Sequence, residues 1–500
     1  MASKERSDKQ PLDVQLQKDK IPINTSLLRA YHEARFTECW EEKLLPEIVK
    51  ILNNNTQGAY SINVRKGNGP DQRVIDLMTK DNCAKMYSEL LEAAKKEHLP
   101  EEFRSKTHFD FRSGKRVYCA DESGSETSLQ APDSAHFRPR NPHRFDEPVM
   151  GDSAGTTSTG NTATLGPLLE VNKRLYRLVN WHLFDDEVGN RNHNWDKRKP
   201  PAELELVHPS PSDLAQYSAG DSLVKIGKVV AYSGPMYKTN RAIASSGPLG
   251  SPAKETWQTT TDWALCETHE DGNPNKVRHI LDGEETGETS CFFQDITETT
   301  STMTKGDRVY ATGRSSGYTE GELCMPSYLK NDDETVQRDW AVSSYAREDA
   351  AWEEGMGIFG DSGAGIMDRS NRLIGQLWGR NHYDDDPKEP AITYFTRITD
   401  IFDDIQERWP GDYRCSRPKL PGEVLHTNGT DGTALAITEI LNSVSTTEGS
   451  TDSLSNERHL DVVTEVRRSS ARSALMVTGN GNKAKHFWIH HAATWPELQA

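Results

Sequence analysis

The stretch Gly360-Asp361-Ser362-Gly363-Ala364-Gly365 carries more information about the fold than any other part of this 500-residue chain. A nucleophilic serine needs an exposed hydroxyl, a neighbouring base and backbone N–H groups that face a developing oxyanion. Flanking glycines let the backbone turn tightly enough to supply those groups. An apolar hairpin follows at once, because Gly365-Ile366-Met367 returns as the apolar run from Leu373 to Trp378. We therefore interpret Ser362 as a nucleophile, with the N–H groups of Gly360 and Ser362 as the oxyanion hole.

A base for this serine is expected upstream, where a second hairpin ends on a histidine. Residues 168–171 return as 175–179 across Asn172-Lys173, and Asn180-Trp181-His182 follows. Most of the 16 histidines are expected on the surface, whereas His182 follows an apolar strand. The third group should be a buried carboxylate that fixes the imidazole tautomer. Asp262 fits that role, because it stands beside the apolar residues Trp263-Ala264-Leu265.

The order His182, Asp262, Ser362 is that of chymotrypsin-like proteases and differs from the order in subtilisins and α/β-hydrolases. The chain resembles this family over roughly residues 150 to 405, and residues 309–323 resemble its strand, glycine turn and strand between Asp and Ser. The combination of Thr164-Leu165-Gly166 with the segments around Asp262 and Ser362 most resembles intracellular fungal trypsin-like proteases, including the amino-acid-sensing signalling type. The resemblance implies a two-barrel β fold and peptide hydrolysis through an acyl-enzyme intermediate.

Two positions depart from the secreted members of that family. Leu183 stands where they usually carry a disulfide cysteine, which agrees with a reducing compartment. Leu377 stands where the family often has a serine that supports the aspartate. We therefore expect Asp262 to have one hydrogen bond fewer, with lower but not abolished activity.

The resemblance also implies a primary specificity pocket. Its base lies six residues before the nucleophile, which a count without gaps places at Met356. Gly379 is expected to form an open wall after Trp378. A methionine offers dispersion contacts and no charge, so medium apolar residues should be preferred over basic ones. A shift of two or three residues in the loop would instead bring Glu353 or Glu354 to the base and reverse that preference.

Changes in sequence pattern divide the chain into five parts. We predict a mainly β protein with a disordered segment (1–25), a small α+β domain (26–120), a linker (121–147), the protease domain (148–408) and a polar, partly disordered tail (409–500). Residues 1 to about 147 are expected to act as a regulatory or pro-region. In secreted relatives a freed apolar N-terminus pairs with the Asp before the nucleophile, here Asp361. Val149-Met150-Gly151 is the only weak candidate for such an end.

Composition limits the class of partner and the compartment. With 59 basic and 76 acidic residues the net charge is −17, which argues against nucleic acid and anionic membranes as partners. No run approaches 18 apolar residues, and the charged N-terminus lacks the apolar core of a secretory signal. The seven cysteines contain no CxxC pair. We expect a cytoplasmic or nuclear protein that is not secreted; its oligomeric state stays open.

Three other motifs suggest rival sites. Gly151-Asp152-Ser153-Ala154-Gly155 matches a nucleophile elbow, but the Thr-rich segment that follows is a poor helix. His486 and His490 have a zinc-compatible spacing but lack an adjacent Glu and a clear third ligand. Asp384-Asp385-Asp386 could suggest a cation site, although adjacent acids in a loop are more often solvated. No P-loop or dinucleotide-binding fingerprint is present, so we expect neither a metal nor a cofactor.

Two functions follow from this sequence. The first is an intracellular serine endopeptidase that hydrolyses protein or peptide substrates through His182, Asp262 and Ser362. The alternative is a catalytically weak or inactive protease-fold module that acts in protein interaction or signalling. Three residues of the right types in the right order favour the endopeptidase.

Overall fold

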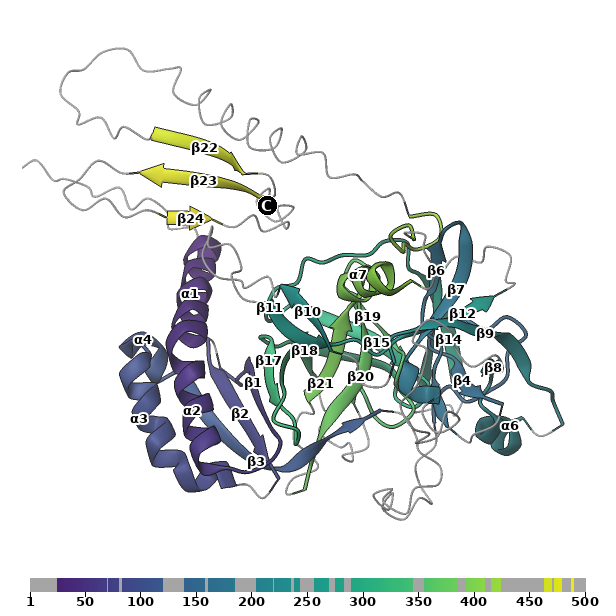
Figure 1. The fold of residues 1–500 in the computed structure, drawn as a ribbon, viewed down its shortest axis with the longest axis horizontal. Helices are drawn as coiled ribbons and strands as arrows, with labels where there is room; N and C mark the ends of the chain where they lie inside the picture. Colours follow the sequence, from purple (N-terminus) through teal and green to yellow (C-terminus); the bar gives the residue numbers. More distant parts are fainter. Residues whose placement is uncertain are drawn as a thin grey trace, which may run out of the picture.

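The computed structural model of this chain is mainly β, as the sequence predicts, with one helical layer at its N-terminal end (Figure 1). It describes residues 25–69, 71–80, 83–119, 139–157, 161–184, 204–218, 220–234, 238–242, 256–268, 275–282, 289–344, 355–384, 392–409, 415–423, 463–469, 472–478 and 487–489. The domain bounds given above stay predictions.

The helical layer is built from the segments in which apolar residues recur with helical period. The first rod runs through α1 (Thr25–Cys39), a π-helical turn η1 (Trp40–Leu44) and α2 (Leu45–Asn55). Pro46 does not interrupt it, because the π-helical turn that precedes Pro46 carries the rod into α2. The second group comprises η2 (Cys83–Tyr87), α3 (Ser88–His98) and α4 (Glu101–Arg104).

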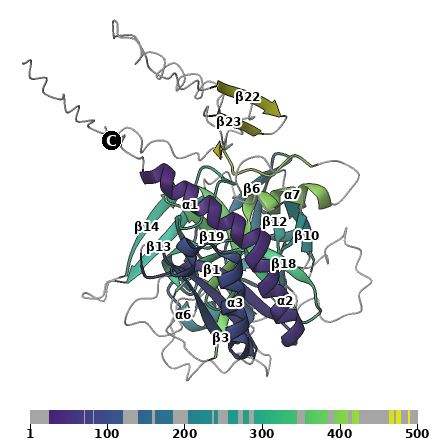
Figure 2. The same cartoon turned by 90° about the vertical axis from the view of Figure 1, so that its left-hand side faces the viewer.

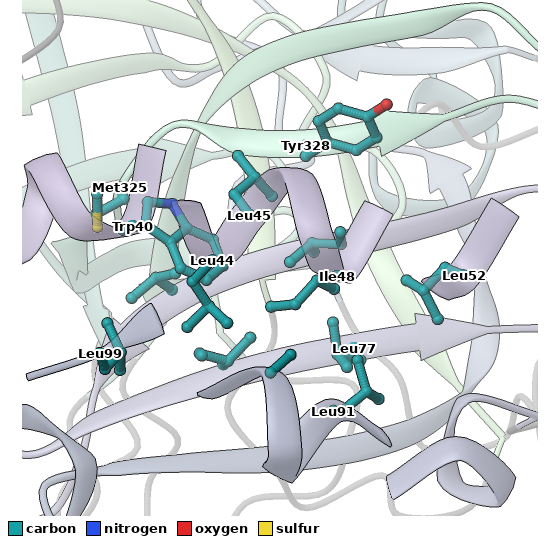
Figure 3. Close-up of a cluster of buried hydrophobic side chains, with 14 of the residues drawn as sticks. Trp40, Leu44, Leu45, Ile48, Leu52, Leu77, Leu91, Leu99, Met325 and Tyr328 are labelled. Atoms are coloured by element: carbon teal, nitrogen blue, oxygen red, sulfur yellow. The ribbon is translucent and has the colours of Figure 1, made fainter. Parts of the chain in front are cut away.

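These helices cover one face of a hairpin and a third strand (Figure 2). The strands are β1 (Tyr60–Lys66), β2 (Arg73–Thr79) and β3 (Thr107–Tyr118). Trp40, Leu44 and Ile48 pack against Leu77 in a buried cluster (Figure 3). The same cluster includes Tyr328, which lies far along the chain on a strand that pairs with β1. The N-terminal core is therefore shared with the part that carries Ser362.

Six strands that surround Ser362 close into a ring. They follow the order β16-β15-β19-β20-β21-β18, and β16 pairs back onto β18. Their bounds are β15 (Arg308–Gly313), β16 (Gly317–Leu323), β18 (Val336–Ser344), β19 (Gly365–Asp368), β20 (Leu373–Tyr383) and β21 (Ile392–Arg397). The hairpin predicted after Ser362 is β19 with β20.

The N-terminal strands continue this same sheet. β1 pairs antiparallel with β17 (Ser327–Lys330), which follows β18 in the sheet. At the other end β3 pairs parallel with β2 and antiparallel with β20. Figure 1 shows β3 extending from beneath the helices toward β20. One strand of the N-terminal region thus lies along the strand that follows the nucleophile.

The other half of the β structure is a seven-stranded antiparallel sheet. Its order is β5-β4-β8-β9-β12-β7-β6. Its members are β4 (Ser153–Thr156), β5 (Thr162–Thr164), β6 (Leu168–Val171), β7 (Arg174–Val179), β8 (Glu205–His208), β9 (Val224–Tyr232) and β12 (Ala264–Thr268). The predicted hairpin of β6 and β7 is confirmed, and Asn172 and Lys173 make its turn with positive φ.

The remaining elements connect or flank the two sheets. They are η3 (Trp181–Phe184), α6 (Pro211–Tyr217), α7 (Ile398–Arg408), the pairs β10 (Lys238–Ala242) with β11 (Thr256–Thr260) and β13 (Lys276–Asp282) with β14 (Thr289–Asp295), and a sheet of β22 (Val463–Ser469), β23 (Arg472–Thr478) and β24 (Phe487–Ile489). Helix α7 ends at Arg408, directly before Trp409-Pro410. The tail sheet was not predicted from the sequence.

Candidate active site

The structure brings His182, Asp262 and Ser362 together from three separate elements. His182 lies on η3, directly after β7; Asp262 lies two residues before β12; Ser362 precedes β19. The pairing of β12 with β7 places Ala264 opposite Val179, which sets the aspartate beside the histidine. His182 Nε2 lies 2.8 Å from Ser362 Oγ, and His182 Nδ1 contacts Asp262 Oδ2. A base therefore links the hydroxyl to a carboxylate.

Asp262 is buried, yet its surroundings favour the ionised form. Burial by itself would raise the pKa of this carboxyl. The charge and hydrogen bonds of His182, together with a hydrogen bond from Asn180, outweigh burial and lower the pKa below its usual value. The backbone N–H of His182 donates to Asp262 Oδ1 at 3.0 Å. A charged Asp262 can therefore hold the imidazole with its Nδ1 proton toward the carboxylate.

Asn180 supplies the support that was expected to be missing. Its side-chain N–H donates to Asp262 Oδ2 at 3.2 Å and to the Asp262 carbonyl at 3.0 Å. The buried Leu377 carries no group that could do so. Sequence reasoning followed the absent serine and overlooked Asn180, although this residue stands only two positions before His182.

The loop that carries Ser362 has a shape that requires glycine on both sides. Gly360 and Gly363 have φ of +94° and +93°. A Cβ on Gly363 would lie 2.4 Å from the Thr164 carbonyl, and one on Gly360 would lie 2.3 Å from Ser315 Oγ. Thr164 fixes the loop to the other sheet, because its N–H donates to the Ser362 carbonyl at 2.8 Å and its hydroxyl donates to the Gly360 carbonyl at 2.8 Å.

The two predicted oxyanion donors point at one oxygen atom. The N–H groups of Gly360 and Ser362 donate to the carbonyl of Cys119, at 2.5 Å and 3.4 Å. Cys119 directly follows β3, and its own N–H donates to the Trp378 carbonyl at 3.2 Å. The ring of Tyr118 lies 5.3 Å from the ring of His182 and 5.9 Å from that of Trp378. Ser362 is fully buried under this segment.

Backbone N–H groups satisfy both carboxylate oxygens of Asp361, so the carboxylate does not need a freed amino terminus as its partner. One carboxylate oxygen accepts from the N–H groups of Ser315 and Ser316, both at 3.0 Å, and the other from Gly357 and Ile358, both at 3.1 Å. The N–H of Val149, the candidate for a freed end, donates instead to Asp152 at 2.8 Å. The nucleophile loop thus has its shape in the uncut chain.

The residues predicted for the specificity pocket lie against the end of β3 and Cys119. Met356 is fully buried and lies in the same apolar cluster as Cys119. The Cys119 thiol donates to the Gly357 carbonyl at 2.7 Å. Trp378 stacks on Tyr394 at 5.5 Å, and a Cβ on Gly379 would lie 2.8 Å from the Val117 carbonyl. Glu353 and Glu354 lie outside the described residues.

In the part of the chain that the structure describes, the rival motifs do not assemble a second site. Ser153 is fully buried, and its hydroxyl donates to Asp213 Oδ2 at 2.6 Å, with no histidine ring nitrogen on the hydroxyl. Asp384 accepts from the Ser113 hydroxyl at 3.1 Å. Asp385, Asp386, His486 and His490 lie outside the described residues. Among the residues that are described, no group of three or more His, Cys, Asp or Glu side chains could hold a metal ion.

Comparison with known proteins finds similar solved structures but no similar sequence family. No model of a protein family matches the chain, and no curated protein sequence does. Similar solved structures are the serine proteases Thermobifida fusca Protease A (12% identity, TM-score 0.29, 51% of this chain and 94% of that one) and Cellulomonas bogoriensis chymotrypsin (13%, 0.28, 51% and 93%). A glutamic-acid-specific serine protease is similar at 13% identity and a TM-score of 0.28, over 51% of this chain and 96% of that one. These values are too low to carry an argument about function, which must come from the chemistry of the site itself.

Proposed function

We propose that this chain is a serine endopeptidase that hydrolyses peptide bonds of protein substrates. One observation carries the proposal. His182 Nε2 lies 2.8 Å from Ser362 Oγ, beside two N–H groups that share a single carbonyl oxygen. A base on the nucleophile and a pair of donors for the oxyanion are the two requirements of acyl transfer.

Each residue then has a defined role. Ser362 Oγ attacks the substrate carbonyl carbon while His182 Nε2 accepts its proton and passes it to the leaving amine. Asp262 stays ionised and stabilises the imidazolium that forms. The N–H groups of Gly360 and Ser362 stabilise the charge on the oxygen of the tetrahedral intermediate. Water then hydrolyses the acyl-enzyme, with His182 as the base.

We also infer a reducing compartment, cytoplasmic or nuclear, as for the intracellular fungal proteases that the sequence resembles. All seven cysteines are unpaired, and five of them are buried: Cys39, Cys119, Cys266, Cys324 and Cys415. No helix in the described ranges is both long enough and apolar enough to cross a lipid bilayer.

Labelling with a fluorophosphonate tests the proposal and separates it from the inactive-module alternative. The probe reacts with a serine only where a base activates it. We expect label on the wild-type chain, a tryptic peptide that maps it to Ser362, and none on Ser362→Ala. Ser153→Ala serves as the matched control and should label like wild type. Absence of label on both the wild-type chain and the Tyr118→Ala variant, in which the strand over the site is loosened, would establish the inactive module instead.

A further inference from the structure

A cavity of about 320 Å³ lies against the paired strands β13 and β14. Three of its walls are apolar, because Phe145, Val149 and Phe293 line it. None of the three catalytic side chains contributes to its lining. Sites for small molecules are cavities of this kind, mostly apolar with a few well-placed polar groups. The charged residues of the cavity therefore decide which ligand it fits.

Arg278 is a buried cation with one terminal nitrogen left over. Only 6% of this residue is exposed to solvent. Its Nε and Nη2 donate to the two carboxylate oxygens of Asp152, at 2.8 Å and 3.3 Å, and Nη2 also donates to the Glu147 carbonyl at 3.3 Å. Arg278 Nη1 makes no hydrogen bond to any residue that the structure describes, although Arg278 lines the cavity. A guanidinium with a free N–H group at a cavity wall is a ready donor for an anion.

Two aromatic rings hold this guanidinium in place. Its central carbon lies 3.6 Å from the ring centroid of Phe145 and 4.8 Å from that of Phe293. The pairing of β13 with β14 sets Arg278 directly opposite Phe293. Both contacts are within the range of cation–π interactions. Phe293 nevertheless remains 50% exposed, so an apolar group in the cavity would cover ring surface that now faces water.

Lys276 adds a second cation to the same wall. It lies two residues before Arg278 on β13, so both side chains are on one face of the strand. Lys276 lines the cavity, and within the described ranges its ammonium makes no ion pair, not even with Asp295 opposite it in the register. Asp152 already balances the charge of Arg278. The ammonium of Lys276 is therefore left to attract a negative group in the cavity.

Two acidic residues also line the cavity and limit the charge of a ligand. Asp146 and Glu147 are both exposed to solvent, and Asp146 is in an ion pair with Arg144 at 2.7 Å. Water and salt screen the exposed carboxylates, so their repulsion of a single negative charge is small. A ligand with two negative charges has only one unpaired cation to neutralise it. The cavity therefore favours a ligand with one negative charge.

We propose that this cavity binds a small monocarboxylate that carries an apolar group. The carboxylate accepts hydrogen bonds from Arg278 Nη1 and from the Lys276 ammonium, and the apolar group packs against the three apolar walls. Such a site is separate from the catalytic triad. The inference does not rest on the proposed function, because binding here needs neither the nucleophile nor its base.

Isothermal titration calorimetry of the full chain with hydrocinnamate tests the proposal. We expect a Kd of about 1 mM or lower. The neutral amide of the same acid should bind at least roughly tenfold more weakly, because it loses the charge-assisted hydrogen bonds. Phenylsuccinate should be weaker because of its second charge, and acetate because it lacks the apolar group. Absence of hydrocinnamate binding up to about 10 mM would overturn the proposal. Tighter binding of the cation phenethylamine would overturn it too, since the acidic residues would then dominate the cavity.

Two neighbouring phenylalanines of β14 provide a matched pair of variants. Phe292 and Phe293 are 44% and 50% exposed, but only Phe293 lines the cavity. Phe293→Ala should weaken hydrocinnamate binding by roughly tenfold, whereas Phe292→Ala should change it by less than about twofold. Equal losses in both variants would mean that the acid only adheres to exposed rings, and would refute the site.

Lys276→Gln tests the charged wall while leaving the buried ion pair of Arg278 intact. Removal of the ammonium should weaken hydrocinnamate binding by roughly tenfold and leave the affinity for the neutral amide nearly unchanged. Circular dichroism and urea unfolding of the same sample establish that the variant is folded. An unchanged affinity for hydrocinnamate in Lys276→Gln would contradict the proposal.

Discussion

The chain contains the tripeptide Gly-Asp-Ser three times. Two of these, residues 151–153 (the first copy) and 360–362 (the second copy), have opposite surroundings. In the first copy, Asp152 forms a buried ion pair with Arg278 at 2.8 Å, and the Ser153 hydroxyl donates to Asp213. In the second, four backbone N–H groups hold Asp361, and the Ser362 hydroxyl faces His182 Nε2. The local string is the same, and the difference lies in what the rest of the fold brings to it.

A histidine lies beside the first copy as well, but its ring is already used. His208 Nδ1 lies 2.7 Å from the Ser153 carbonyl, and its Nε2 accepts from the N–H of Phe145 at 2.9 Å. Neither nitrogen is left to accept a proton from the Ser153 hydroxyl. His182, in contrast, has one nitrogen on Asp262 and the other on Ser362. A serine becomes a nucleophile only where the fold supplies a base with a free lone pair.

Replacing Ser362 or Ser153 with alanine should give the largest difference between the two copies. Ser362→Ala removes the nucleophile, so peptide turnover should fall by about 10⁴ or more while the free energy of unfolding changes little. Ser153→Ala removes a buried hydrogen bond to Asp213, so it should cost about 1–3 kcal/mol of stability and leave turnover per folded molecule within a few-fold of wild type. Peptide assays and urea unfolding measure both. More than trace turnover by Ser362→Ala would remove this serine from the mechanism.

Asparagine at Asp262 and at Asp152 should likewise separate an effect on catalysis from an effect on stability. Asp262→Asn favours the wrong imidazole tautomer, so kcat should fall by roughly 10⁴. Asp152→Asn leaves the buried Arg278 without its charge partner and should cost about 3–5 kcal/mol of stability, without lowering kcat of the folded fraction. Steady-state kinetics on protein purified at low temperature distinguish the two. Equal losses of kcat would mean that Asp152 also supports the site.

The contrast between the two copies also explains how far the sequence could lead. Ser362 was predictable because glycines and a hairpin surround it, and His182 and Asp262 because each adjoins an apolar strand that must be buried. Asn180 was not, since its amide reaches Asp262 only when β7 and β12 pair. Cys119 was placed at the end of a separate domain, because the pairing of β3 with β20 joins residues more than 250 positions apart and leaves no periodic signal in the sequence.

A smaller effect is expected from the two asparagines that support these aspartates. Asn180 donates to Asp262 at 3.2 Å, and Asn141 donates to Asp152 at 2.8 Å. Asn180→Ala should lower kcat by roughly tenfold with KM nearly unchanged, because it loosens the carboxylate that orients His182. Asn141→Ala should reduce stability by about 1 kcal/mol and leave kcat unaffected. An unchanged kcat in Asn180→Ala would show that the backbone N–H of His182 is sufficient to hold Asp262.

The last contrast is a pH dependence of stability that arises beside the first copy alone. Burial lowers the pKa of His208 below its usual value of 6.5. A second ring proton would also face the Phe145 N–H. The unfolded chain binds a proton as the pH falls through 6.5, while folded His208 does not until lower pH, so acid favours unfolding. Between pH 7 and pH 5 this linkage should cost the folded state up to about 2 kcal/mol.

His208→Asn has no titrating group at this position in that range and should lose this part of the pH dependence of stability. Other groups, such as the buried Asp76 whose pKa is raised to about 6, titrate equally in both proteins, so the difference between the two urea-unfolding curves isolates His208. Parallel curves for wild type and variant from pH 7 to pH 5 would mean that the His208 ring takes up its proton at the same pH in the folded and the unfolded chain, so that Ser153 lies beside a charged ring at pH 5.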